Sequence, residues 1–364
     1  MAKNFILQIV PRVPGGLDGV GDYALTLAEK LRDQFGFSTI FATPNASSVT
    51  TVREFEVHPL DRIQDQPGTF DHVLLHYVSY GYQKRGIPFG LLSILRRMAR
   101  NRRGVFLTVF HELYASGPPW RSEFWLKPIQ IHLARSVAHL SDECIVASEN
   151  YLHKLQRLVP NTLIHLHPTP SGLGEPSLSR EQVANRDPHR WAIVGGTLLG
   201  EKSLGSFARV IQQIPESIAP KTLFLLGGSE NPAVRSILSH LEIESHYRPR
   251  IAAADASEVL KTCSFAWIDY FHRPDIETSV VLKSSAFAAA CAHAVIPVFP
   301  HRGTPISIER DRLPGPFFVE SNAADVPTAE DRSTVAANIY DWYHRHVSSE
   351  SLVRGIAESF GIKK

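Results

Sequence analysis

Glycines gather between the first apolar stretch of the chain and the helix predicted to follow it. Gly15, Gly16, Gly19 and Gly21 fall within seven residues. Glycine lets a backbone approach a ligand closely, and the N–H groups at the start of a helix attract anions. The segment is therefore a candidate phosphate-binding loop, and Asp18 within it is a candidate catalytic base. A flexible surface turn is the alternative interpretation.

A second glycine segment occurs midway along the chain and ends in a lysine. Gly195 and Gly196 follow an apolar run, and Lys202 comes just before the next predicted helix. An ammonium group beside a helix N-terminus favours the binding of a diphosphate. The spacing is not that of a Walker motif, which argues against an ATPase. A solvated lysine beside a turn is the alternative.

Histidines lie at the ends of two neighbouring predicted strands. His111 and Glu112 directly follow the strand over 105–110, and His76 ends the preceding strand. Ligands of open α/β sheets collect at the carboxyl ends of the strands, so His111 is a candidate for deprotonating an acceptor. A purely structural role is the alternative for both histidines. The other histidines lack a third ligand at a usable spacing, and we predict no metal site.

A dinucleotide-binding dehydrogenase is a further possibility, because residues 19–24 fit the pattern G-x-G-x-x-A. Two observations argue against it. The glycines lie several residues beyond the strand instead of in its first turn. The second predicted strand also ends without the acidic residue that binds a ribose.

Secondary-structure elements must position these candidate residues. Short apolar runs alternate with helical stretches along the chain, which predicts a mostly parallel sheet built from βα units. The predicted strands cover residues 5–10, 38–42, 72–76, 105–110, 143–147 and 162–166, then 191–195, 222–226, 264–269, 296–299 and 317–319. The predicted helices cover residues 23–35, 91–103, 127–140, 150–158, 203–214, 233–240 and 286–293, and one or two more lie within 334–360.

The length of 364 residues exceeds the size at which a single core usually stops growing. Residues 167–176 are dense in proline and glycine, which is typical of a boundary between domains. We therefore predict a first domain over 1–175, a second over 176–335 and terminal helices over 336–364. The first two should each be doubly wound.

Composition excludes several classes of protein. Hydrophobic residues at 43% and charged residues at 20% are globular values, and no apolar run is long enough to span a bilayer. The apolar N-terminal stretch is too short for a signal peptide. Three separated cysteines indicate neither disulfides nor a metal site. The sequence thus predicts a soluble, cytoplasmic protein.

Charge gives little indication of a macromolecular partner. The net charge is +2, and no nucleic-acid-binding motif is present, so we predict no nucleic-acid partner. One local cluster is an exception, and a solvated helix face or a peripheral contact with anionic lipid would each explain it. It consists of Arg96, Arg97, Arg100, Arg102 and Arg103.

The order of these features resembles that of the GT-B fold glycosyltransferases, particularly the large retaining group. The shared features are the first glycine segment, residues 194–202, residues 225–228 and a glutamate-containing loop before a helix of small residues. The resemblance spans nearly the whole chain. It implies an α/β fold in which two Rossmann-like domains face a central cleft, with the acceptor on the first domain and the donor on the second. It also implies that the terminal helices pack back on the first domain, through Trp342, Tyr343, Val347 and Leu352.

Site residues follow from the same resemblance. It places Gly15, Gly16 and Gly19 beside the donor phosphates and the acceptor. Lys202 would contact the donor diphosphate, and Glu277 matches the first glutamate of a paired-glutamate motif near the donor sugar. The other implied donor contacts are Gly196, Thr197, Gly228, Arg250, Ile251, Lys283, Ser284 and Ser285.

Two positions depart from the pattern of that family. The arginine that usually accompanies the lysine is replaced by the pair Gly196 and Thr197, and the second glutamate falls at Ser285. Lys283 and Ser284, at a predicted helix start, can contact phosphate or ribose in its place.

The predicted function is transfer of a sugar from a nucleotide-diphosphate sugar to the hydroxyl of a glycan or small-molecule acceptor, without a metal or other cofactor. Lys202 would stabilise the charge of the leaving diphosphate. The resemblance favours retention at the anomeric carbon and a role in glycan biosynthesis. A catalytically inactive binding subunit and a sugar-nucleotide epimerase on the same fold are the alternatives, the first because two charged positions are replaced.

Overall fold

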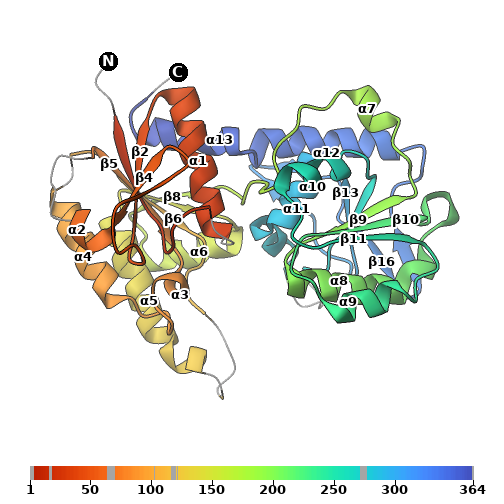
Figure 1. Ribbon diagram of the computed structural model, residues 1–364, viewed down its shortest axis with the longest axis horizontal. Helices are drawn as coiled ribbons and strands as arrows, with labels where there is room; N and C mark the ends of the chain where they lie inside the picture. The colour runs from red at the N-terminus through yellow and green to blue at the C-terminus, as the bar shows by residue number, and fades with distance from the viewer. Residues whose placement is uncertain are drawn as a thin grey trace. The chain divides into compact units, whose positions relative to one another are not determined.

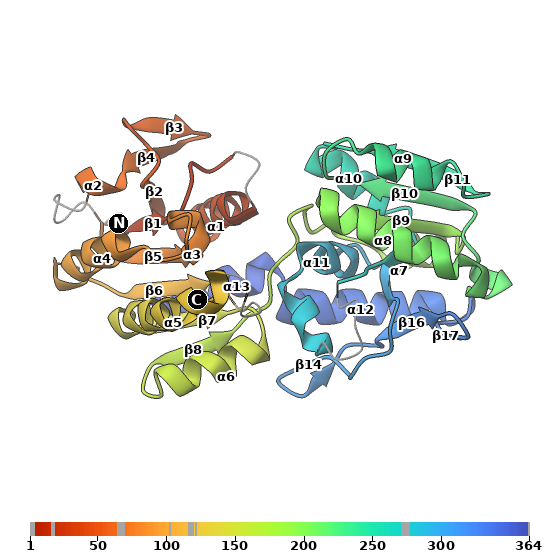
Figure 2. The same ribbon diagram turned by 90° about the horizontal axis from the view of Figure 1, so that it is seen from below.

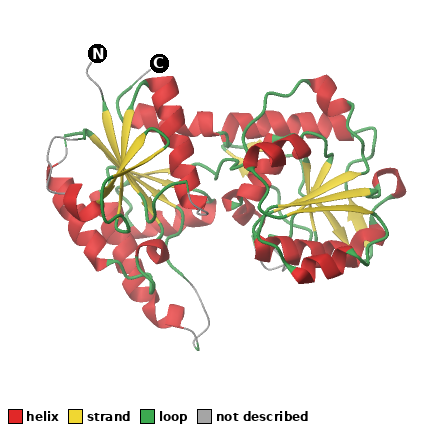
Figure 3. Ribbon diagram, viewed as in Figure 1, coloured by secondary structure: helices red, strands yellow, loops and turns green. Residues whose placement is uncertain are grey.

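The computed structural model describes residues 4–15, 19–63, 70–101, 103–115, 120, 122–270 and 277–362. It divides the chain into two compact units. The first consists of Met1–Pro168 with Ser349–Lys364, and the second of Thr169–Ser348. In each unit a twisted sheet forms the middle layer and helices cover both faces (Figures 1 and 3).

Eight strands form the sheet of the first unit, in the order β3-β4-β2-β1-β5-β6-β7-β8. All neighbouring strands are parallel except β3 and β4, which form an antiparallel hairpin. Strands β5 and β6 are buried along their whole length, which explains their continuous apolar sequences. The strands are β1 (Phe5–Ile9), β2 (Ser38–Thr43), β3 (Thr50–Val52), β4 (Phe55–Pro59), β5 (His72–Tyr77), β6 (Phe106–Phe110), β7 (Glu143–Val146) and β8 (Leu163–Leu166).

Helices cover the two faces of this sheet with separate cores. Leu31 of α1 and Ile356 of α13 belong to the core of one face, while α4, α5 and α6 cover the other. In α4 the buried residues Leu91, Leu95 and Met98 recur every three or four positions, as expected of an amphipathic helix. The helices are α1 (Gly19–Phe35), α2 (Leu60–Ile63), α3 (Ser79–Tyr82), α4 (Phe89–Asn101), α5 (Ser122–Leu140), α6 (Glu149–Leu158) and α13 (Ser349–Ser359).

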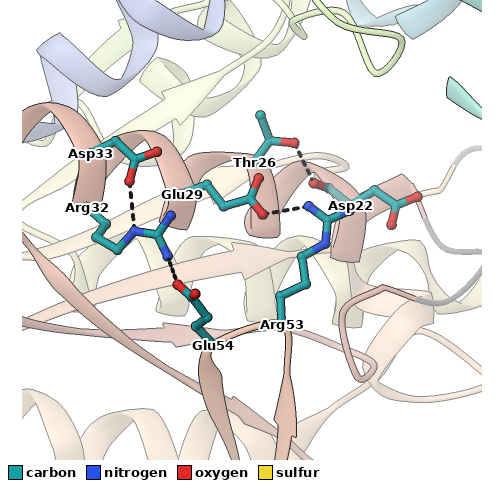
Figure 4. Close-up of polar contacts among 7 residues, drawn as sticks. All are labelled: Asp22, Thr26, Glu29, Arg32, Asp33, Arg53 and Glu54. Atoms are coloured by element: carbon teal, nitrogen blue, oxygen red, sulfur yellow. Dashed lines mark hydrogen bonds and ion pairs between the residues drawn. The ribbon is translucent and has the colours of Figure 1, made fainter. Parts of the chain in front are cut away.

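Helix α1 is tied to the β3–β4 hairpin by ion pairs (Figure 4). Arg53 donates to Glu29 at 2.5 Å, and Arg32 donates to Glu54 at 2.6 Å. Such exposed pairs contribute little stability individually, but they fix the hairpin against the helix that follows the first glycine segment.

Seven strands form the sheet of the second unit, in the order β11-β10-β9-β12-β13-β16-β17. Only β17 runs antiparallel to its neighbour, and β14 and β15 form a separate antiparallel pair. The strands are β9 (Arg190–Val194), β10 (Thr222–Leu226), β11 (Glu244–Arg248), β12 (Phe265–Trp267), β13 (Ile296–Phe299), β14 (Ser307–Ile308), β15 (Asp311–Arg312), β16 (Phe317–Glu320) and β17 (Ala323–Asp325).

Helices α8 and α9 cover one face of the second sheet, and α7, α10, α11 and α12 cover the other (Figures 1 and 2). Large aromatic side chains fill the core; Phe207 of α8 packs on Trp267 of β12 with ring centroids 5.7 Å apart. The helices are α7 (Arg180–Ala184), α8 (Thr197–Val210), α9 (Pro232–Leu238), α10 (Ala253–Leu260), α11 (Ser285–Ala292) and α12 (Arg332–His346), with short 3-10 helices η1 (Ile211–Gln213), η2 (Glu216–Ile218) and η3 (Thr278–Lys283).

Several helices begin earlier than the sequence predicted, and two of these differences concern the glycine segments. Helix α1 begins at Gly19 instead of Tyr23, and α8 begins at Thr197 instead of Ser203. Gly200 is buried within α8, where packing on the sheet overrides its low helix propensity. Lys202 therefore lies in the second turn of α8, whereas the sequence predicted it just before the helix.

The terminal segment is divided between the two units. Trp342, Tyr343 and Val347 belong to the core of the second unit, whereas Leu352 of α13 packs in the first. The expectation that all four form one face on the first domain is corrected accordingly. Residues 169–175 also lie in the second unit, where the Tyr343 hydroxyl accepts a hydrogen bond from the Ser171 N–H at 2.8 Å.

Candidate functional site

Two glycine loops meet at the carboxyl edge of the second sheet, directly after β9 and β10. Gly227 and Gly228 have φ values of +97° and +69°. A Cβ on Gly227 would lie 2.8 Å from the carbonyl oxygen of Gly195, and a Cβ on Gly228 would lie 2.8 Å from the Thr197 nitrogen. The two loops thus pack backbone against backbone, which requires glycine at both positions whether or not a ligand is bound.

Gly196 differs from these glycines because no other part of the protein packs against its Cα. A Cβ placed there has no atom within 4 Å, and Gly196 caps α8 without a side-chain hydrogen bond. The first N–H groups of a helix have no intrahelical partners, and they lie at the positive end of its dipole. The Thr197 hydroxyl accepts a hydrogen bond from the Ser229 N–H at 2.8 Å, which fixes the second loop beside this helix end. The arrangement is suited to an anion.

A cavity of about 980 Å³ lies beside α8 in the same unit. One wall is a face of α8, and the other consists of residues that follow β12, β13 and β16, at the carboxyl edge. Among its lining residues are Lys202, Arg209 and His301, and also Glu201, Asp269 and Glu320. The cavity therefore offers cationic groups to phosphate and carboxylates to the hydroxyls of a sugar.

Lys202 is half-buried in this cavity wall. In the described part of the chain it makes no hydrogen bond or ion pair, whereas its neighbour Glu201 accepts a hydrogen bond from Asn231 at 2.7 Å. The Lys202 ammonium group is therefore available to a ligand.

Asp269 is the functional candidate that the sequence interpretation missed. The residue is only 3% exposed, yet its Oδ1 has no hydrogen-bond partner among the residues that the structure describes. Its N–H donates to the Ser203 hydroxyl at 3.2 Å, which fixes the residue against α8. A buried carboxylate oxygen without a partner is costly and needs an explanation, and a sugar hydroxyl would supply the missing hydrogen bond. Its place just after β12, at the carboxyl edge, was the available signal.

The predicted glutamate loop leads into α11. Glu277 is exposed and directly precedes η3, and Ser285 is exposed at the start of α11. The Ser284 hydroxyl accepts a hydrogen bond from the Phe287 N–H at 3.3 Å, so it acts as a helix cap. Lys283 is half-buried.

The residues predicted near the base are separated. The Arg250 N–H donates to the Gly228 carbonyl at 2.9 Å, which places Arg250 at the glycine loops with a left-handed φ of +55°. Ile251 instead lines a different cavity of about 630 Å³, together with Arg190 and Phe224. The structure thus brings Lys202 and Asp269 to one cavity and Ile251 to another.

In the first unit, the glycine segment is described only in part. Gly16 and Asp18 lie outside the described residues, as does Arg102. Gly15 has a φ of +80°, and its Cβ would lie 3.1 Å from Val52 of the hairpin. Gly19 is the first residue of α1, and a Cβ there has no atom within 4 Å.

A histidine pair occupies the carboxyl edge of the first sheet. His76 is fully buried, with its Nδ1 3.2 Å from Nε2 of His111 and its Nε2 2.9 Å from Oε1 of Gln8. The Tyr23 ring packs edge-on against both imidazoles. Burial lowers the pKa of His76 well below its ordinary value, and His111 lowers it further.

The neutral state of His76 fixes the tautomers of the pair. The Gln8 oxygen can only accept, so His76 Nε2 carries its proton and His76 Nδ1 accepts from His111 Nε2–H. This hydrogen bond fixes the orientation of the His111 imidazole at the carboxyl edge of the sheet. Glu112, which follows it, is exposed.

The basic cluster lies along α4. Arg96, Arg97, Arg100 and Arg103 are exposed. Within the described ranges, no helix is long and apolar enough to cross a membrane. No group of three or more His, Cys, Asp or Glu side chains is arranged to hold a metal ion in the same part of the chain.

Comparison with known proteins gives a fold but no close relative. No family model and no curated protein matches the sequence. The structure is similar to an alpha-glucosyltransferase in complex with UDP and a 13-mer DNA, with 11% identity, a TM-score of 0.59 and coverage of 99% of this chain and 100% of that chain.

Two further solved structures are similar over nearly their whole length. One is a trehalose-6-phosphate synthase studied for glycosyl transfer with retention, at 9% identity and a TM-score of 0.57. The other is WaaG, a glycosyltransferase involved in lipopolysaccharide biosynthesis, at 10% identity and a TM-score of 0.56. Each match covers 98% of this chain and 99% of the other. The chain therefore has the GT-B fold of two Rossmann-like domains, which confirms the predicted fold class.

Proposed function

We propose that the protein is a metal-independent glycosyltransferase, which moves a sugar from a nucleoside diphosphate sugar to an acceptor hydroxyl. The observation that carries this proposal is the cavity beside α8, where the half-buried Lys202 and the buried, unpartnered Asp269 Oδ1 line one space. The similar structures of nucleotide-sugar enzymes support it, because an alpha-glucosyltransferase with the same fold holds UDP.

The donor is proposed to bind with its two chemical parts on groups of opposite charge. Lys202 and the open start of α8 bind the diphosphate and stabilise the negative charge that grows on it as the glycosidic bond breaks. Asp269 accepts a hydrogen bond from a hydroxyl of the donor sugar, and its burial strengthens that bond. Glu277, Lys283 and Ser285 are proposed as further donor contacts from the segment that precedes and begins α11.

The acceptor is proposed to bind on the first unit, beside His111. The imidazole of His111, which is held in place by His76, contacts the acceptor and orients it. We propose that transfer proceeds with retention, as studied for the similar trehalose-6-phosphate synthase. An oxygen of the departing diphosphate then takes the acceptor proton, so a separate protein base is not required.

A donor screen combined with two variants tests this proposal. Nucleoside diphosphates and their sugars should raise the melting temperature, because they bind the native state. Lys202→Ala and Asp269→Asn should each lower donor hydrolysis or transfer at least about tenfold, a loss of about 1.4 kcal/mol. Lys221→Ala, an exposed lysine at the start of β10, is the matched control. Unchanged rates in both site variants would remove this cavity from the donor site.

A nucleotide-binding subunit without transferase activity is the second candidate. Gly196 and Thr197 replace the arginine of the resembled family, which leaves Lys202 without a second cation from this loop. Saturable nucleotide binding, with neither donor hydrolysis nor transfer to any acceptor of a broad panel, would favour the subunit over the enzyme.

A further inference from the structure

Positive charge is concentrated in one part of the first unit. Residues 79–140 contain ten Lys and Arg but only two Asp and Glu, whereas the rest of the chain contains 28 and 34. The segment includes α4 and α5, which lie side by side on one face of the sheet (Figures 1 and 2). The whole chain is thus close to neutral, although this part of the first unit is strongly basic.

Exposed hydrophobic side chains gather in the same segment. Five of the eight large exposed hydrophobic residues in the described part of the chain belong to it. Four of them form a group at the start of α5, which we name the aromatic tip: Trp120, Phe124, Trp125 and Ile129. Trp120 is 83% exposed and Trp125 is 70% exposed. Such a patch on a protein surface marks a site of interaction.

The buried Gln130 fixes cationic residues next to the aromatic tip. Its amide nitrogen donates to the Arg85 carbonyl at 3.2 Å and to the Tyr80 hydroxyl at 3.0 Å, and its oxygen accepts from the Ala115 N–H at 2.9 Å. The loop with Lys84 and Arg85, both exposed, is therefore held against the helix turn that follows Ile129. Apolar and cationic groups form one surface.

We propose that this surface docks the first unit on an anionic lipid bilayer. Tryptophan prefers the headgroup level of a bilayer, where its ring is apolar and its N–H stays hydrated, and basic side chains are attracted to anionic headgroups. Trp125 and Ile129 are four residues apart, so they lie on one side of α5 and can enter the interface together. The exposed arginines of α4 extend the attraction along the same face.

Nucleic acid is the competing occupant, since a similar structure holds DNA. Surfaces that bind single-stranded nucleic acid combine cations with aromatic rings, which stack on the bases. Ile129 of the aromatic tip has no ring and cannot stack on a base, so the composition of the tip favours lipid. The membrane proposal does not depend on the proposed transferase activity. It can therefore fail while the donor site is correct, and the reverse also holds.

Tryptophan fluorescence provides a direct test on the full-length protein. Trp191, Trp267 and Trp342 are fully buried, so a spectral change on binding reports Trp120 and Trp125. Vesicles with equal parts of phosphatidylglycerol and phosphatidylcholine should shift the emission to shorter wavelength, and brominated acyl chains should quench it. Phosphatidylcholine vesicles should have no such effect. High salt should reverse the binding by screening.

Variants separate the apolar contribution to vesicle binding from the electrostatic one. Trp120→Ser with Trp125→Ser should abolish detectable sedimentation with the anionic vesicles. Lys84→Gln with Arg85→Gln should lower the partition coefficient about 25-fold, or about fivefold for each charge. The matched controls are Leu163→Ser for an exposed apolar residue of the same unit, and Arg180→Gln with Lys221→Gln for exposed cations of the second unit.

The controls should bind as the unaltered protein does, with unchanged melting temperatures in all variants. The proposal is overturned if anionic vesicles do not bind at low salt, or if the tip variants bind them equally well. It is also overturned if a labelled DNA duplex binds through the same residues while vesicles do not, which would identify a nucleic-acid surface.

Discussion

The carboxyl edges of the two sheets share a backbone arrangement but differ in chemistry. In the first unit, Gln8, His76 and His111 form a hydrogen-bonded row against the Tyr23 ring. In the second unit, Lys202 and Asp269 line a cavity, and the buried Asp269 Oδ1 has no hydrogen-bond partner within the described part of the chain. The fold thus supplies two equivalent edges, and only the residues that follow the strands decide which one presents charge to a ligand.

The contrast also concerns protonation. The first edge holds the neutral imidazole of His76, because burial disfavours its charged form. The second has the half-buried Lys202 in the wall of a cavity. A diphosphate needs cationic groups, and this difference underlies the proposal that the donor binds to the second unit.

Deleting residues 349–364 tests the independence of the two units and should have the largest effect. The deletion removes α13 and exposes the core around Leu31, at a cost of about 1.5–3 kcal/mol for each large apolar side chain that α13 buries. That sum approaches the whole stability of a domain. Calorimetry should show early melting of the first unit only, with nucleotide binding retained by the second. A single, unshifted transition would contradict this, and deletion of residues 363–364 is the control.

Acid should destabilise the second unit through the buried His293. Its Nδ1–H donates to the Ala289 carbonyl and its Nε2 accepts from the Ser257 hydroxyl, and burial lowers its pKa from 6.5 to about 4. Between these values the unfolded chain binds more protons, so stability is complete above pH 6.5 and falls as the pH drops towards 4, by about 3 kcal/mol.

Urea unfolding followed by the buried tryptophans of the second unit, measured between pH 4 and pH 7, checks this slope. His293→Phe with Ser257→Ala should flatten it without leaving a buried polar group unpaired. An equal slope in that variant would assign the acid sensitivity to other groups, such as the buried His76 of the first unit.

His111→Ala tests the proposal that the acceptor binds to the first unit and the donor to the second. It should lower transfer about tenfold, or about 1.4 kcal/mol, while the affinity for nucleotide stays unchanged. Isothermal titration with nucleotide and a transfer assay measure the two effects separately. Glu112→Gln, at the exposed neighbouring position, is the control. Weaker nucleotide binding by His111→Ala would contradict the assignment of the donor to the second unit.

Glu277→Gln should have the smallest effect. The residue is exposed, so replacing a charge-assisted hydrogen bond by a neutral one should raise the KM for the donor only about threefold. Donor kinetics with saturating acceptor provide the measurement. An effect as large as that of Lys202→Ala would mean that this loop encloses the sugar.

The sequence predicted the strands well where their patterns are local. Runs with consecutive apolar residues, such as those at 73–75 and 223–226, form β5 and β10 as expected. Strand β11 was missed because Glu244–Arg248 has no apolar pattern; it exists because its backbone pairs with β10 at the sheet edge. The hairpin of β3 and β4, held to α1 by Arg53 and Glu29, was also missed, although Phe55 and Val57 alternate with more exposed residues in β4.

By itself, the sequence determined that this chain forms two α/β units. It also located the glycine segments, and the lysine that follows the first strand of the second unit. These features could be predicted because hydrophobic periodicity and turn residues act locally. Tertiary structure alone decided that α8 begins at Thr197, that α12 and α13 belong to different units, and that Asp269 is buried with an unpaired oxygen. These properties depend on which surfaces pack together, and residues distant in the chain determine that packing.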